Sequence, residues 1–321
     1  MEVKYDIQLM VNVAQMYYID GLKQEDIAKK LHISRSLISM ILTEAKEVGI
    51  IDIKVRNPQL NNGELADELK SLFGLKYCVI VPTTVQDPNT LRKLVAQRAV
   101  EIFNQKVADR DNVGVAWGRT CYDFISYYKP DKAHKDVNII PLTGGSNQTA
   151  PYYQLNEMVR LFAEKINGTP YFIHAPALTV SNQEQEMFMN SSSMQLIQEK
   201  WNNMDVIISS VGTLPTMNID REPYTGEYEI NEKLRDNEAV GDLCARYFNI
   251  NGKYIKEGYY NRIIGIPILA LKKAKIKITI ASGKEKAIPI LGCLRTGIVD
   301  VFISDEQTVK TVLKLDKEFK K

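Results

Sequence analysis

The sequence has few of the residues that build metal, disulfide or membrane sites. It contains three histidines and four cysteines in 321 residues, and the cysteines, at positions 78, 121, 244 and 293, form no Cys-x-x-Cys pair. This spacing predicts neither a zinc site nor a disulfide framework, and favours buried free thiols in a reducing compartment. The longest apolar run, residues 263–271, is about half of the ~18–20 residues that a membrane helix needs.

No charge of either sign dominates. Lys and Arg number 41 against 39 Asp and Glu, a net charge of +2, which argues neither for nor against a nucleic-acid partner. The opening residues, MEVKYDIQLM, lack a signal-peptide pattern, so we expect a cytoplasmic, nucleoid-associated protein without a cofactor or a metal. The length favours a small head followed by a second domain of about 260 residues with its own core.

Residues 22–55 have the pattern of a winged helix-turn-helix head. Apolar residues recur at helical spacing over 22–42, 31–33 turns the chain, and Ser34 stands where an N-cap should accept from the free amides of the next helix. We predict two short helices, a longer tail helix and a hairpin. Lys23 gives the first motif helix a weak cap, and polar residues 57–63 form a linker, so the predicted domains are 1–56 and 57–321.

The second motif helix offers short or forked hydrogen-bond donors suited to base edges in the major groove. Met40 replaces a basic residue that would contact phosphate, and the head has as many acidic as basic residues. An electropositive face must therefore come from the arrangement of its Lys and Arg side chains, and affinity should depend on dimerisation. The predicted DNA-binding residues are Gln24, Ser34, Arg35, Ser36, Ser39 and Lys46. The alternative is a helical hairpin that caps a larger core.

Beyond the linker, short β-rich runs alternate with helix-length amphipathic segments. Continuously apolar strands in such an alternation predict an α/β domain with a doubly wound, mostly parallel sheet. The predicted strands are 77–81, 112–117, 137–142, 171–175, 205–211, 276–281 and 298–304. The predicted helices include 64–73, 90–107, 119–128, 152–166, 192–202, 237–247, 284–295 and 306–315.

Three predicted strands end in chemistry suited to an anionic or polyhydroxylated ligand. In parallel sheets ligands bind at the carboxyl ends of strands, beside helix N-termini. One strand ends in a tight turn with a guanidinium and a hydroxyl, the next in a glycine pair followed by polar residues, and the third in Gly212-Thr213. The candidates from the first two are Gly118, Arg119, Thr120, Gly144, Gly145, Ser146 and Gln148. Each glycine taken alone is more often only a turn.

Other positions could line the same site. Asp242 is a carboxylate in an otherwise apolar, helix-like segment; it could accept from sugar hydroxyls, cap a helix or pair with Arg246 four residues on. Lys286 begins the helix after strand 276–281 and could neutralise a phosphate, although Lys284 competes for this role. His174 fits a hydrogen-bonded core histidine better than a general base. The two tryptophans, at 117 and 201, fit packing.

These segments together resemble a known family. The head, followed in order by VGVAWGRT, IIPLTGG, HAPA, DVIISSVGT, AVGDLCARYF, RIIGI and ASGKEKAIPILGCLRTGIVDVFISDEQT, closely resembles the SorC-type bacterial transcriptional regulators of sugar catabolism. The resemblance implies an effector domain similar to a sugar-phosphate isomerase that has lost catalysis, and a sugar or phosphosugar near the residues named above. It also implies homo-oligomers, dimers or tetramers, on palindromic operators. Where some relatives carry a lysine, this chain has Thr143, so noncovalent binding is expected.

The sequence therefore predicts a DNA-binding regulator, a repressor, of a sugar-utilisation operon, controlled by a reversibly bound effector. The alternative is a sugar-phosphate isomerase or deaminase with a DNA-binding appendage. That enzyme would need a base and an acid within hydrogen-bond reach of the substrate, and the candidates are Asp242, His174 and Glu232. A protein-binding adaptor is a further alternative. We expect no enzymatic activity.

Overall fold

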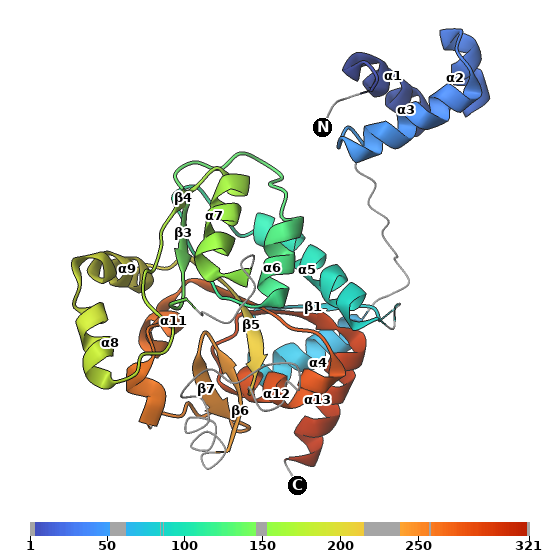
Figure 1. The fold of residues 1–321 in the computed structure, drawn as a ribbon. Helices are drawn as coiled ribbons and strands as arrows, with labels where there is room; N and C mark the ends of the chain where they lie inside the picture. Colours follow the sequence, from blue (N-terminus) through green and yellow to red (C-terminus); the bar gives the residue numbers. More distant parts are fainter. Residues whose placement is uncertain are drawn as a thin grey trace. The chain divides into compact units, whose positions relative to one another are not determined.

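The computed structural model describes residues 4–51, 62–83, 85, 87–145, 153–214, 238–256 and 258–319. The chain divides into two compact units, Met1–Leu60 and Asn61–Lys321 (Figure 1). Each unit has its own hydrophobic core. The linker predicted over 57–63 coincides with the division between the units.

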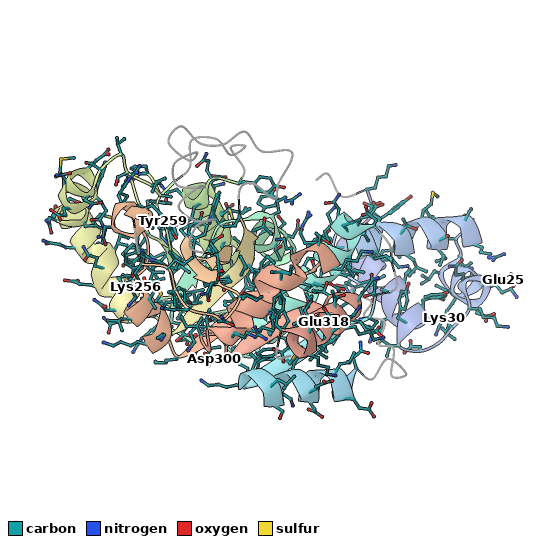
Figure 2. All side chains as sticks on the ribbon, turned by 90° about the horizontal axis from the view of Figure 1, so that it is seen from below. Glu25, Lys30, Lys256, Tyr259, Asp300 and Glu318 are labelled. Atoms are coloured by element: carbon teal, nitrogen blue, oxygen red, sulfur yellow. The ribbon has the colours of Figure 1, made fainter. Side chains whose placement is uncertain are left out.

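The first unit is a three-helix bundle. Helices α1 (Ile7–Tyr18), α2 (Gln24–Leu31) and α3 (Arg35–Glu47) bury an apolar core to which each contributes, including Met10, Ile27 and Ile38. The turn between α2 and α3 has His32 in the left-handed region (φ 55°), and Ser34 caps α3 by accepting from the amide of Leu37 at 3.2 Å. The side chains of Glu25 and Lys30 project from α2 in Figure 2.

Two predictions for this unit need correction or remain open. The tail helix is not a separate element, because α3 runs without a break to Glu47, and the third helix of the bundle is α1, which precedes the motif. The predicted hairpin, which residues 56–58 would close, lies mostly outside the described residues, since the first described stretch stops at Ile51. The weak cap of α2 is confirmed, since Lys23 makes no side-chain capping hydrogen bond.

The second unit is built on a parallel sheet. Its strand order is β1 (Tyr77–Val81), β9 (Val301–Asp305), β8 (Ile276–Ile280), β5 (Val206–Thr213), β2 (Asn112–Val115), β3 (Asn138–Pro141) and β4 (Thr169–Pro170), and every neighbouring pair in that order is parallel. Strands after β2 first extend the sheet in one direction, and β5 then returns to the other side of β2. The order of the strands thus reverses between β2 and β5, although the two strands are parallel.

Helices cover both faces of this sheet (Figure 1). One layer contains α5 (Pro88–Asn104), α6 (Arg119–Tyr127) and α7 (Leu155–Ile166), and the other contains α4 (Gly63–Phe73), α12 (Ala287–Arg295) and α13 (Glu306–Glu318). The first layer is joined by an aromatic cluster in which the rings of Phe103, Phe124, Tyr128 and Phe162 lie 4.9–6.2 Å apart. Helices α8 (Asn182–Met189), α9 (Ser192–Asn202) and α11 (Ile268–Lys273) lie near the β3–β4 end of the sheet in Figure 1.

Two sequence predictions for the second unit are wrong. Residues 238–247 of the predicted helix 237–247 form no helix; they contain β6 (Ala239–Leu243) and the start of β7 (Arg246–Asn249), an antiparallel hairpin that pairs with the end of β5. The strand predicted over 171–175 is not formed, because the observed strand β4 covers only Thr169–Pro170 and ends before residue 171. There the side-chain amide of Asn156 both donates to and accepts from the backbone of Ile173, which replaces strand pairing.

Candidate effector cavity and DNA-binding face

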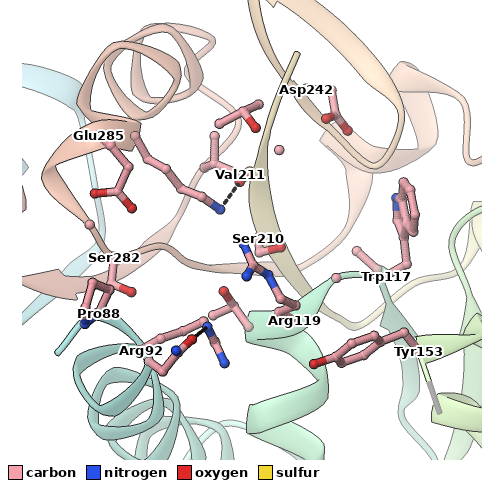
Figure 3. Close-up of a pocket in the computed structure, with 18 of the residues that line it drawn as sticks. Pro88, Arg92, Trp117, Arg119, Tyr153, Ser210, Val211, Asp242, Ser282 and Glu285 are labelled. Carbon is pink, nitrogen blue, oxygen red and sulfur yellow. Dashed lines mark hydrogen bonds between the residues drawn. The ribbon is translucent and has the colours of Figure 1, made fainter. Parts of the chain in front are cut away.

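A cavity of about 460 Å³ opens at the carboxyl ends of β2, β5 and β8. This is the point where the strand order reverses, the usual place for a ligand in a doubly wound sheet, and the volume suits a small ligand. Figure 3 shows Arg92, Ser282 and Glu285 towards one end, Asp242 and Trp117 towards the other, and Arg119 and Ser210 between them. The lining also includes Pro88, Asn89, Gly118, Thr120, Tyr153, Val211, Gly212, Thr213, Cys244, Gly283 and Lys286.

The turn from β2 into α6 brings an uncapped helix N-terminus to this cavity. Gly118 occupies the N-cap position with φ 123°, a conformation that favours glycine, and it supplies no side-chain cap. A Cβ at Gly118 would lie 3.2 Å from the hydroxyl oxygen of Ser210, so glycine also permits the close approach to β5. Gly118 therefore offers no side-chain acceptor to the first amides of α6, at the helix end where an anion is favoured.

Lys286 brings a second cation to the cavity from the start of α12. Its Nζ donates to the carbonyl oxygen of Val211 at 3.2 Å. Burial, and next the guanidinium of Arg119, lower the pKa of Lys286, while Glu285 and Asp242 oppose the shift. The lysine is thus held where its charge is poorly solvated, and an anion bound beside it would favour the charged form.

Asp242 reaches the cavity from the β6–β7 hairpin. Opposite it in the ladder is Gly212, where a Cβ would lie 1.9 Å from Asp242 Oδ1, so only glycine leaves room for this carboxylate. The hairpin turns through Cys244 and Ala245, both at positive φ (54° and 59°), as a tight two-residue turn requires. The amide of Ala245 donates to Asp242 Oδ2 at 3.0 Å. The alternative prediction, in which Asp242 pairs with Arg246, does not fit the hydrogen bonds of Arg246. The guanidinium of Arg246 instead donates to the carbonyls of Gly265 and Ile266.

Arg92 on α5 is a cavity residue that the sequence analysis missed. Its Nε donates to Asp123 Oδ2 on α6 at 2.6 Å, and Nη1 donates to Asn89 Oδ1 at 2.8 Å. Both Arg92 and Asp123 are largely buried, so the guanidinium is fixed in place. Ser210, Ser282, Glu285 and the rings of Trp117 and Tyr153 were missed as well. Trp201 packs in the core as predicted, and its indole donates to the carbonyl of Pro141.

Five of the predicted effector residues line the cavity: Gly118, Arg119, Thr120, Asp242 and Lys286. Gly144 and Gly145 do not, and their amides donate to the backbone carbonyls of Ile264 and Ala175 at 2.9 Å. A Cβ at Gly144 would lie 2.4 Å from the carbonyl oxygen of Pro176, so this glycine permits close backbone packing. Ser146 and Gln148 lie outside the described residues. His174 is exposed and away from the cavity, so its interpretation as a core histidine is wrong.

The head presents the predicted DNA-binding side chains to solvent. Arg35, Ser36 and Ser39 are exposed along the first turns of α3. Arg35 lies 3.5 Å from Glu25 on α2 in a solvent-exposed ion pair, which contributes little to stability and is easily exchanged for another partner. Ser34 is used as the cap, Gln24 is half-buried at the start of α2, and Lys46 lies over the ring of Tyr18.

Among the described residues, no helix is long and apolar enough to cross a membrane. The same part of the chain contains no cluster of three or more His, Cys, Asp or Glu side chains that could hold a metal ion. Cys121 of α6 is a buried free thiol, and burial raises its pKa to about 12.

The chain is similar over its whole length to known regulators. Residues 57–314 match the Sugar-bind family model, which describes a sugar-binding domain. The sorbitol operon regulator of Klebsiella pneumoniae is 26% identical, over 98% of this chain and 100% of that protein. The deoxyribonucleoside regulator of Bacillus subtilis is 28% identical, over 95% and 97%. The crystal structure of full-length SorC from Klebsiella pneumoniae superposes with a TM-score of 0.82 at 25% identity, covering 97% of this chain and 99% of that one. The chain belongs to the SorC-type family of sugar-binding transcriptional regulators.

Proposed function

We propose that this protein is a transcriptional repressor of a sugar-utilisation operon and that a phosphorylated sugar, bound reversibly in the cavity, controls it. The observation that carries the proposal is the arrangement of Arg119 and Lys286 beside the uncapped N-terminus of α6. Two cations and free helix amides are poorly satisfied by a neutral polyol and well satisfied by a phosphate. The relatives named as sorbitol and deoxyribonucleoside regulators support the class of function.

The other end of the cavity suits the carbohydrate part of the effector. The carboxylate of Asp242 can accept from two hydroxyls, and the rings of Trp117 and Tyr153 offer apolar faces to the C–H groups of a sugar. Thr143 lies outside the cavity lining and carries no amine that could form an imine, so binding there is noncovalent. Gly144, Gly145, Ser146 and Gln148 have no part in the proposed contacts.

The head binds operator DNA through α3. Arg35, Ser36 and Ser39 contact base edges in the major groove, and exposed lysines of the same unit, including Lys29 and Lys30, contact phosphates. The head has no basic excess, so one copy binds weakly and two copies on a palindromic operator bind tightly. On this proposal the protein is a homo-oligomer that is bound to the chromosome in the cytoplasm.

The enzyme alternative has less support. Of its two described candidate residues, Asp242 lines the cavity and the exposed His174 does not. The third, Glu232, lies outside the described residues. The relatives are named as regulators rather than as enzymes. We infer a binding role without turnover. Hydrolysis or isomerisation of a bound sugar phosphate, abolished by Asp242→Asn, would contradict this inference.

Thermal-shift screening of the full chain tests the effector proposal directly. A ligand that binds only the folded state at 100 times its Kd adds about 2.7 kcal/mol to the free energy of unfolding. Sugars and their phosphates are compared in pairs, and we expect the phosphorylated member to raise Tm and to release the protein from DNA upstream of its own gene. A neutral sugar that shifts Tm more than its phosphate would refute the phosphate assignment.

A further inference from the structure

Helix α1 carries an uncharged surface that the three-helix bundle leaves uncovered. Its sequence, with the capping residue Ile19, is IQLMVNVAQMYYI and contains no Asp, Glu, Lys or Arg. Ile7 is 60% exposed, Val11 36%, Tyr18 39% and Ile19 77%. A helix that faces solvent ordinarily carries charged residues on that side. Depletion of charge with enrichment of aliphatic and aromatic side chains is instead the composition of an interface core.

The spacing of these residues indicates what covers them. Ile7, Val11, Ala14 and Tyr18 follow one another at intervals of four, three and four residues, which is the seam along which two helices pack. The adjoining side of α1 is already used, since Met10 and Val13 lie in the core of the bundle. Ala14, only 8% exposed at the edge of that core, is small enough for a second helix to approach closely. The seam therefore fits another helix rather than a loop or a strand.

We propose that α1 pairs with α1 of a second copy of this chain, along Ile7, Val11, Ala14 and Tyr18. In a two-fold contact each residue meets the same surface of the partner, so a charged seam would face its own charge. None of the four seam residues is charged, so the seam residues themselves bring no like charges together. A charge described beside them is that of Lys46 of α3, whose ammonium lies over the ring of Tyr18. This inference rests on the proposed function, because pairing of heads through α1 is what would place two α3 helices on one palindromic operator.

A cysteine probe reports the pairing locally and without DNA. The four native cysteines are buried, so an exposed cysteine introduced into the full chain is the one that reacts. Val11→Cys treated with a short bis-maleimide should give covalent dimers as the main product. Lys30→Cys, exposed on α2, is the matched control and should give few. Equal yields from the two variants would overturn the proposal, whatever the oligomeric state of the remainder of the chain.

Charge complementation identifies the partner as a second copy. Val11→Glu and Val11→Lys each place like charges across the two-fold contact and should weaken binding to DNA from upstream of the gene by at least about tenfold. The two variants co-expressed and purified together should recover most of that loss, because Glu then faces Lys. Asn12→Glu, a charge on the same helix outside the seam, should change binding less than about threefold.

The outcomes separate the two proposals. If α1 packs on the effector-binding unit instead, the single variants lose affinity and co-expression recovers nothing, which overturns the pairing and leaves the regulator function standing. If the unchanged protein does not bind the DNA, the regulator function fails, while the crosslinking result still decides the pairing. Circular dichroism melting of each variant verifies that the head remains folded; Val11 lies outside the buried core of the bundle.

Discussion

Replacing Lys286 by methionine should have opposite effects on ligand binding and on stability. Methionine keeps the unbranched apolar stem and removes the amine that donates to the carbonyl of Val211 at 3.2 Å. In the ligand complex a lysine–phosphate hydrogen bond contributes about 1.5–3 kcal/mol. We therefore expect Lys286→Met to raise the Kd for the effector about 10- to 150-fold. Isothermal titration with the sugar phosphate found by screening measures this change.

Without ligand the same substitution should raise the melting temperature of the protein. Burial lowers the pKa of Lys286 below its value in the unfolded chain, so the folded state binds this proton less tightly than the unfolded state does. The penalty is fully present below the folded pKa and is relieved as pH rises through the folded pKa towards 10.5, the ordinary value of lysine. The unfolding free energy of the unchanged protein should therefore rise with pH in this window, and that of Lys286→Met should rise less.

The matched control is Lys284→Met, two residues earlier, where the lysine is exposed and lines an adjoining hollow rather than the cavity. It should change neither the Kd nor the pH dependence of stability appreciably. If Lys286→Met bound the effector as tightly as the unchanged protein, Lys286 would have no part in holding the phosphate. A lower melting temperature without ligand would show that its hydrogen bond to Val211 outweighs the cost of burying its charge.

Three further substitutions test other parts of the molecule. Arg35→Ala should weaken operator binding by about 1–3 kcal/mol and relax sequence preference at one base pair, as a gel-shift comparison of operator variants can measure; a uniform loss at every base would assign Arg35 to a phosphate. Asp242→Ala should leave DNA binding intact and abolish the response to the effector, and a gel-shift titration in which it is still fully induced would remove this residue from the site. Ala245→Gly relieves a left-handed alanine, a strain of about 1–2 kcal/mol, and after the entropy cost of glycine should stabilise the protein by up to about 1 kcal/mol in urea unfolding; destabilisation would mean that the alanine methyl packs usefully.

Much of the sheet could be predicted because its strands are buried on both faces. A fully buried strand appears as a continuous apolar run, and the sequence predicts β5, β8 and β9 within a few residues for this reason. The sequence of the β6–β7 hairpin resembles that of a helix, because its alternation is short and its turn contains Cys244 and Ala245 rather than Asn or Gly. What makes β6 a strand is its pairing with the end of β5, a long-range contact with no local signal.

The candidate site was predicted where local sequence carries the chemistry. Gly118 and Arg119 follow a recognisable strand, and Asp242 stands out as a carboxylate among apolar residues. Arg92 has no such signal, since it is one of several basic residues in a long helix, and only the approach of α5 to α6 turns it towards the cavity beside Asp123. Gly144 had the right composition for a ligand loop but serves backbone packing, which the sequence does not distinguish.

The proposed contacts with the effector lie on two different parts of the fold. Asp242 on β6 and Lys286 at the start of α12 lie on one part of the fold, because α12 packs against β6. The packing is close, since a Cβ at Gly241 would lie 2.8 Å from the Cβ of Pro289. Arg119 lies across the cavity, at the start of α6. A sugar phosphate held by all three therefore ties α6 to α12 across the ends of β2 and β5. An effector changes operator affinity only by its difference in affinity for two arrangements of the protein. A change in the separation of α6 and α12 supplies such a difference, and coupling of about 1–3 kcal/mol would alter operator affinity 5- to 150-fold.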